Sequence, residues 1–448
     1  MAGTPAAGAA APYCAWRGEL LWFVADPGPG DGDTASWRHE PDGVLLARGG
    51  RIEAAGAASA LLAGLPAGTE VVDFRGHLLL PGFVDTHVHY AQTGIIASFG
   101  EGLLEWLERC ALPAEMRFCD AGHARAEAEF FCTELLRNGT TTALVFATTH
   151  PASADAIFEV AAARGLCLVA GKVMMDRNGP APLRDTAQSS YDESKALIAK
   201  WHGHGRLGYA VTPRFAPTST DAQLEAAGAL VREHPGVWLQ SHVAESRAEA
   251  RWVAALFPWS RSYLDVYDRF GLVGPRSVYA HCIHLDRADR ERIAAAGAAM
   301  SFCPTSNLFL GSGLFDLGAA STAGARVALG TDVGAGTSLG ILQTLNEAYK
   351  VIRLTGQTLT PMRAFYLATL GGARALGLDA RIGSFERGHD ADFVVLDPRA
   401  TPLLAHRMET VESLAGKLFA LMTLGDDRAV LATYVMGRRA HLRDATVR

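Results

Sequence analysis

The sequence has little of what a cysteine-built metal site, a disulfide scaffold or a membrane span requires. Its seven cysteines are scattered and contain no C-x-x-C pair, which argues against a zinc site made of thiolates and favours a reducing compartment. No apolar run reaches the roughly 18 residues that a membrane span needs. The Ala/Gly-rich start, residues 1–12, lacks a basic segment before a long apolar core, so we interpret it as a loose terminus and not as a signal peptide. We expect a cytoplasmic protein without membrane contact.

A large excess of one charge is also missing. The formal net charge is -6 over 448 residues, which provides no basic surface for nucleic acid or anionic lipid. Hydrophobic residues make up 49% of the chain and charged residues 20%, as in ordinary globular proteins. These values favour a small molecule as the partner and argue against nucleic acid.

The order of segments predicts an α/β fold. Up to about residue 75, short strand-like runs separated by Gly and Pro are typical of a small antiparallel β unit. From GFVDTHVH onward, apolar strands alternate with helical segments, and this alternation calls for parallel strands with crossover helices. Eight such strands in about 250 residues predict a (β/α)8 TIM barrel.

After residue 380 the pattern returns to β, in RIGSFERGHDADFVVLD and RAVLATYVMGRRAHL. Each flanking β segment is too short to bury a core by itself, so the two should pair with each other. We therefore predict a composite small β-sandwich domain from residues 1–79 and 381–448, and a barrel from residues 80–380.

Polar residues recur where the predicted barrel strands end. In such barrels the chemistry lies at the C-terminal ends of the strands. The residues found there are His87, His89, Arg214, His242, His281 and Asp332, with Asn307 just beyond a strand. Chance would seldom place imidazoles and a carboxylate at so many of these positions.

His87 and His89 lie two residues apart on one strand, so both rings should point to the same face. Two imidazoles with a third ligand from His242 and a carboxylate from Asp332 suit zinc. An internally hydrogen-bonded histidine pair would give the same H-x-H spacing. The fourth strand offers Thr212 and no bridging carboxylate or modified lysine, which favours a single metal ion.

Glu245 follows His242 by three residues and could fold over the same mouth of the barrel, where a carboxylate suits proton transfer. An ordinary surface glutamate is the alternative. A second H-x-H pair, His202 and His204, follows no apolar strand and is flanked by glycines. We predict that it lies in a loop.

Several of these motifs resemble those of a known superfamily. PGFVDTHVH, the later His242, His281 and Asp332 in that order, and ADFVVLD resemble the amidohydrolase superfamily over nearly the whole chain. Within it, longer segments look like guanine deaminases, namely EGLLEWLE, VTPRFAPTST, AHCIHL, FCPTSNLFLGSGLFDL and GTDVGAGTS.

The resemblance implies a role for each matching position. The residues matching the ligands of a single zinc ion per subunit are His87, His89, His242 and Asp332. Those matching catalytic groups are Glu245, His281 and Asp332, with Glu245 as proton shuttle. Those matching the purine site are Gln92, Arg214 and Phe215, together with His242, Glu245 and Asp332. A homodimer is also implied. SHVAES and Ala91 depart from the usual pattern and could alter the purine pocket.

The expected reaction is hydrolytic deamination of guanine to xanthine and ammonia, by attack of a zinc-bound hydroxide on purine C2. Two alternatives remain at this point. One is another deaminase or dechlorinase on the same barrel, acting on cytosine, a pterin or a triazine. The other is a non-catalytic relative, which we would expect to have lost metal ligands.

Overall fold

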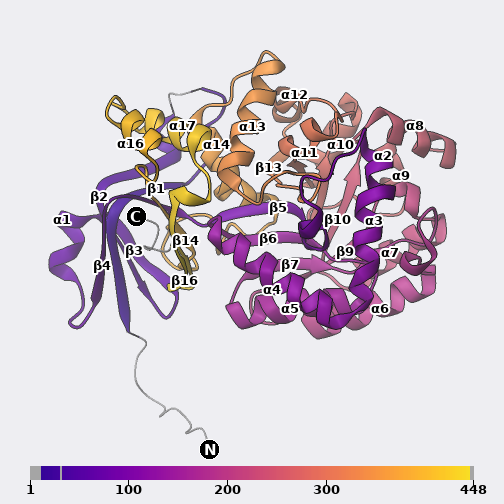
Figure 1. The fold of residues 1–448 in the computed structure, drawn as a ribbon, viewed down its shortest axis with the longest axis horizontal. Helices are drawn as coiled ribbons and strands as arrows, with labels where there is room; N and C mark the ends of the chain where they lie inside the picture. The colour runs from indigo at the N-terminus through magenta and orange to yellow at the C-terminus, as the bar shows by residue number, and fades with distance from the viewer. Residues whose placement is uncertain (1–11, 31–32, 444–448) are drawn as a thin grey trace, which may run out of the picture.

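Figure 1 presents the computed structural model of the chain, which describes residues 12–30 and 33–443. Residues 1–11, most of the start for which we expected a loose terminus, lie outside these ranges. A β domain built from both ends of the chain stands beside a larger barrel of strands and helices. Within the described ranges, none of the helices has both the length and the apolar character that crossing a membrane would take.

The barrel has the eight parallel strand positions that the alternating pattern predicts. They are occupied by β5 (Phe83–His89), β6 (Thr140–Phe146), β7 (Cys167–Gly171) continued by β8 (Val173–Met174), β9 (Leu207–Pro213), β10 (Trp238–Val243), β11 (Ser277–His281), β12 (Ala299–Phe302) and β13 (Arg326–Leu329). The two ends of this sheet meet just beyond β13. There the Asp332 N–H donates to the His87 carbonyl at 2.9 Å, and the His89 N–H donates to the Val333 carbonyl at 2.9 Å.

Helices cover the outside of the barrel, so its strands are buried on both faces. All seven residues of β6 and all seven of β9 are buried, as expected where side chains also fill the interior. The helices that follow the strands are α4 (Ala121–Arg137), α5 (Pro151–Arg164), α6 (Ala187–Trp201), α7 (Asp221–Glu233), α8 (Arg247–Leu256), α9 (Tyr263–Arg269), α10 (Arg287–Ala296), α11 (Pro304–Phe309), α12 (Leu317–Thr322), α13 (Ile341–Leu354), α14 (Pro361–Ala368) and α15 (Leu370–Ala375).

Helix α4 shows how local sequence sets these boundaries. The Asp120 side chain accepts from the N–H groups of Gly122 and His123, which caps the start of the helix. After the last turn, Gly139 has φ of +81°, a conformation that costs glycine little and other residues much more. The chain can therefore turn at once into β6.

The small domain is one seven-stranded sheet with the order β16-β15-β14-β4-β1-β2-β3. Its strands are β1 (Tyr13–Phe23), β2 (Trp37–Arg48), β3 (Arg51–Ala57), β4 (Glu70–Pro81), β14 (Phe393–Leu396), β15 (Val430–Val435) and β16 (Arg438–Leu442). The two ends of the chain pair through β14 and β4, which confirms the composite domain. The expected antiparallel unit is mixed, because β1 and β4 are parallel. The strands share one hydrogen-bonded sheet, which bends so that Ile52 of β3 and Tyr434 of β15 pack in the same core.

Strand β4 joins the two cores through its alternating side chains. Leu78 and Leu80 belong to the large core that continues into the barrel, whereas Leu79 packs in a separate core with Trp16 and Phe393. Successive strand residues point to opposite faces, so one face of this sheet rests on the barrel. β5 starts two residues after β4 ends, so the small sheet leads directly into the first barrel strand.

The C-terminal segment also contains helices, α16 (Pro402–Met408) and α17 (Leu414–Leu424), inserted between β14 and β15. Helix α17 connects to the N-terminal strand β1 through an ion pair between Lys417 and Glu19. His39 Nε2 lies 2.9 Å from the other carboxylate oxygen of Glu19. Partial burial alone would raise the pKa of Glu19, but the hydrogen bonds from His39 and Lys417 lower it overall.

Candidate active site

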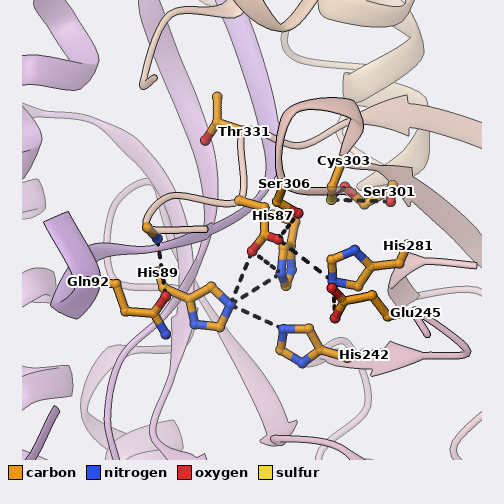
Figure 2. Close-up of polar contacts among 12 residues, drawn as sticks. His87, His89, Gln92, His242, Glu245, His281, Ser301, Cys303, Ser306 and Thr331 are labelled. Atoms are coloured by element: carbon orange, nitrogen blue, oxygen red, sulfur yellow. Dashed lines mark hydrogen bonds and ion pairs between the residues drawn. The ribbon is translucent and has the colours of Figure 1, made fainter. Parts of the chain in front are cut away.

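The first barrel strand places two imidazoles at the mouth of the barrel. His87 and His89 end β5 on the same face, and both side chains are almost fully buried. Their Nε2 atoms lie 3.3 Å apart. Figure 2 shows these rings turned with their nitrogens toward a common point. The H-x-H spacing thus brings the two side chains together as the sequence predicted.

His242 and Asp332 complete the cluster from distant strands. His242, on β10, places Nε2 at 3.1 Å from His89 Nε2. Asp332 follows β13, and its Oδ1 lies 3.1 Å from His87 Nε2 and 3.5 Å from His89 Nε2. One ligand atom from each of the four residues lies within 4.8 Å of the others, a group that could hold a metal ion.

The protonation of this cluster suits a cation. Burial lowers the pKa of His87, and it holds the pKa values of His89 and His242 well below the usual range, so the three imidazoles are neutral. His242 Nδ1 lies 2.6 Å from the carbonyl oxygen of Arg214. Since that nitrogen donates its hydrogen there, the Nε2 lone pair faces the cluster. Neutral imidazoles and a carboxylate are the donors that divalent zinc-type ions use.

Further hydrogen bonds hold Asp332 and the residue before it. Ser306 Oγ donates to Asp332 Oδ2 at 2.5 Å. Asp85, deeper on β5, accepts from the Thr331 hydroxyl at 2.5 Å and from the Thr331 N–H at 3.0 Å. Burial raises the pKa of Asp85 to about 7. Asp85 therefore holds the loop that carries Asp332, although sequence analysis assigned Asp85 no role.

Glu245 lies just beyond β10 and is 3% exposed, so it is not an ordinary surface glutamate. Its Oε1 accepts from Ser312 Oγ at 2.9 Å, and its Oε2 lies 3.3 Å from His281 Nε2. Burial raises the pKa of Glu245 to about 7. A carboxyl group with this pKa can both hold and release a proton near neutral pH.

His281 ends β11, and its Nε2 lies 3.3 Å from Glu245 Oε2 and 3.7 Å from Asp332 Oδ2. Burial alone would lower its pKa, but the charges of Glu245 and Asp332 raise it overall. His281 Nδ1 lies 2.9 Å from Asn307 Oδ1, which fixes the ring and leaves Nε2 directed at the carboxylates.

A cavity opens beside these groups. Its lining includes Gln92, Arg214 and Phe215, the three residues for which we predicted purine binding and no metal or catalytic role. The remaining lining residues are His89, Leu103, Trp106, Leu107, His242, Glu245, His281, Leu310, Asp332 and Ala335. Apolar side chains combined with convergent polar groups are typical of a small-molecule site.

Sequence analysis missed the part of this wall that lies between β5 and α4. There the chain forms η3 (Tyr90–Ile95), α2 (Leu103–Trp106), a π-helical turn (Leu107–Ala111) and α3 (Leu112–Met116). Leu103, Trp106 and Leu107 from this segment line the cavity. Only EGLLEWLE marked them, as a resemblance, because apolar helical residues carry no signal of their own.

The second histidine pair lies in a loop, as predicted. His202 and His204 follow α6, and His202 Nδ1 accepts from the Tyr209 N–H at 3.2 Å. Lys172, the lysine on the third strand, is buried in ion pairs with Asp185 and Glu193. The partners of His202 and Lys172 therefore lie outside the imidazole cluster.

Three imidazoles and a carboxylate at the C-terminal mouth of a TIM barrel, next to a buried acid and a cavity, define a metal-dependent hydrolase of the barrel type. The family model described as "Amidohydrolase family" matches residues 78–440. The chain belongs to the amidohydrolase family and, within it, to the group whose members are named guanine deaminases.

Relatives and solved structures support this placement. A guanine deaminase of Escherichia coli (strain K12) is 51% identical over 403 residues, which cover 90% of this chain and 92% of that one. A structure of E. coli guanine deaminase superposes with a TM-score of 0.93 at 48% identity, covering 96% and 99% of the two chains. A guanine deaminase from C. acetobutylicum with bound guanine in the active site gives a TM-score of 0.86 at 27% identity, covering 95% and 99%.

Proposed function

We propose that this protein deaminates guanine by hydrolysis, giving xanthine and ammonia. The observation that carries the proposal is the position of Glu245, a buried acid with a pKa of about 7, which lines the cavity together with members of the His/Asp cluster. The 51% identity to a guanine deaminase indicates which amine is removed. This activity would place the protein in purine catabolism.

We propose zinc as the metal, with one ion per subunit held by His87, His89, His242 and Asp332. Neutral imidazoles with lone pairs directed at one point, together with one carboxylate, fit this ion. A bound zinc ion would act as a Lewis acid and lower the pKa of a water molecule to about 7. The lysine of the third strand is engaged in other ion pairs, which supports a single ion.

The proton steps are assigned to the protein side chains. Glu245 takes one proton of the water whose oxygen adds to C2 of the purine, and Asp332 holds the second, which stays on the added oxygen. Because Ser312 occupies Glu245 Oε1, the first proton travels on Oε2, which faces His281. Glu245 passes this proton to the ring nitrogen beside C2. Asp332 and Glu245 then move the hydroxyl proton to the amino group, and the C2–N bond breaks to release ammonia as the C2 carbonyl forms. His281 Nε2 donates a hydrogen bond to the attacking oxygen.

The purine is bound by Gln92, Arg214 and Phe215, with His242, Glu245 and Asp332 near its reacting edge. The guanidinium of Arg214 donates to purine acceptors, the Gln92 amide can donate and accept, and Phe215 offers an aromatic face. A site with several such polar contacts should discriminate strongly against purines that lack the matching groups. Adenine should therefore be a poor substrate.

We also propose a cytoplasmic homodimer. All seven cysteines, each within the described ranges, are free, which supports a reducing compartment. The homodimer rests on the resemblance alone. The division at residues 1–79, 80–380 and 381–448 is supported by the change from β4 to β5 near residue 82 and by the return to the small sheet at β14.

A substrate panel tests the proposed reaction. The purified, metal-analysed protein should release ammonia from guanine and far more slowly from adenine, cytosine, a pterin and an amino-triazine. Turnover of one of the other compounds in preference to guanine would replace the guanine assignment and leave the hydrolase class intact.

A further inference from the structure

One buried carboxylate outside the catalytic cluster contacts two of the residues assigned to the purine. Glu115 lies on α3 and is fully buried. Its Oε1 accepts from Gln92 Nε2 at 2.8 Å, and its Oε2 accepts from Arg214 Nη1 at 2.6 Å. Each oxygen thus holds one side chain of the cavity wall, so a single rigid group sets the distance between the two.

Gln92 is fixed from its other end as well. Its Oε1 accepts from the Gly334 N–H at 3.1 Å. A Cβ at Gly334 would meet the Gln92 carbonyl oxygen at 2.5 Å, so this close contact needs glycine. The amide is therefore held in one orientation, between Glu115 and the loop that carries Asp332.

Arg214 keeps donors available for a ligand. Among the described residues, Glu115 is the only hydrogen-bond partner that its guanidinium has, through Nη1. The side chain is almost fully buried and lines the cavity. A buried guanidinium without a counter-charge would be costly, so the carboxylate that pairs with it also determines where its remaining N–H groups point.

We propose that Glu115 is a positioning residue that sets substrate specificity: it holds Arg214 and Gln92 as a fixed pair of hydrogen-bonding groups against one edge of the purine. This inference rests on the proposed function and deepens it. The segment that carries Glu115 also supplies Leu103, Trp106 and Leu107 to the cavity wall. One segment of the chain therefore provides both the apolar side chains of the wall and the carboxylate that positions its polar groups.

The test compares Glu115→Gln and Glu115→Asp with a matched control, Asp392→Asn. Asp392 is likewise a buried carboxylate paired with an arginine, Arg206, but it does not line the cavity. For each variant we would measure zinc content, thermal midpoint, the dissociation constant of xanthine by calorimetry, and kcat and KM. The substrates are guanine, 2-aminopurine, which lacks the 6-oxo group, and 7-deazaguanine, which lacks N7.

Glu115→Gln should keep its zinc and raise KM for guanine about 10- to 100-fold, with a smaller change in kcat, since it disturbs hydrogen bonds to a charged group. It should weaken xanthine binding by a similar factor. Arg214→Lys identifies the analogue, 2-aminopurine or 7-deazaguanine, against which the preference for guanine depends on Arg214. Glu115→Gln should lose preference against that same analogue, and Glu115→Asp should restore part of the loss. Asp392→Asn should lower the thermal midpoint and leave the preference unchanged.

Two results would overturn the proposal. If the wild type deaminates guanine and Glu115→Gln shows the wild-type KM and preference, Glu115 does not position the purine contacts. A loss shared equally by all three substrates would mean a purely structural role. A zinc-loaded wild type that deaminates no purine would instead refute the proposed function, and with it the specificity role proposed for Glu115.

Discussion

Glu245→Gln is the most informative single substitution in the proton pathway. Glutamine has the same shape and can still accept the Ser312 hydrogen bond, but it cannot take up and release a proton. Glu245 is also outside the four-residue cluster that could hold the metal. We therefore expect the variant to fold and to keep its metal while losing the chemical step.

The expected loss follows from the buried position of the acid. With a pKa of about 7, Glu245 is divided between its protonated and ionised forms at neutral pH. Positioned acid–base catalysis is worth about 10²- to 10⁴-fold. At 1.36 kcal/mol for each factor of ten, kcat should fall by the equivalent of about 3 to 5 kcal/mol.

The assay follows loss of guanine absorbance and release of ammonia, with metal analysis of the same samples. Ser312→Ala is the matched control, because it removes one hydrogen bond and leaves the carboxyl group; we expect about a 10-fold loss. Turnover of Glu245→Gln within about threefold of the wild type, far inside the range for acid–base catalysis, would remove Glu245 from the mechanism. Loss of metal in this variant would refute the assumed geometry.

Three further outcomes follow from the structure. His242→Ala should bind little metal after dialysis, whereas His204→Ala, which changes the exposed histidine of the loop pair, should keep the wild-type complement; equal metal contents would contradict the ligand set. Asn307→Ala should keep its metal and lose about 10-fold in kcat, because His281 loses the acceptor that fixes its ring; an unchanged rate would exclude this role. Glu19 has a folded-state pKa below its unfolded value of 4.5, so its ionised form stabilises the fold above that pH and the contribution disappears as pH falls through the folded pKa. Glu19→Gln should therefore unfold in urea with about 1 kcal/mol less stability at pH 7, a gap that narrows below pH 4.5; a pH-independent gap would refute this assignment.

The barrel could be predicted because its signal is local. Each strand is a short apolar run buried on both faces, and each is followed by a helical segment with its own start and stop signals. The apolar runs LGYAVTPRF and VWLQSHV enclose β9 and β10, and TTALVF begins one residue after the start of β6. Only the interruption between β7 and β8 at Lys172 divides one expected strand into two.

The small domain was harder to predict, because its pairing depends on contacts far apart in the sequence. The runs that form β1 and β4 look the same whether the strands are parallel or antiparallel. Their parallel pairing follows from the path of the chain through β2 and β3. Helices α16 and α17 interrupt the C-terminal β segment, and the clearest pattern in this part of the sequence comes from the strand-like runs on either side of them.

The site divides in the same way. His87, His242 and Asp332 could be found because the fold places strand ends at one mouth, and their residue types bind metals. Glu115 could not be found, since its role depends on α3 folding back over the barrel to meet Arg214. No spacing along the chain reports such a contact.

The most direct test of the account combines the metal with the reaction. The protein is stripped with a chelator, titrated with zinc, and assayed at each step for xanthine and ammonia formed from guanine. We predict that both products appear in equal amounts and that activity rises until one zinc ion is bound per subunit. Full activity in the metal-free protein, or one bound zinc without any xanthine, would contradict the central claim.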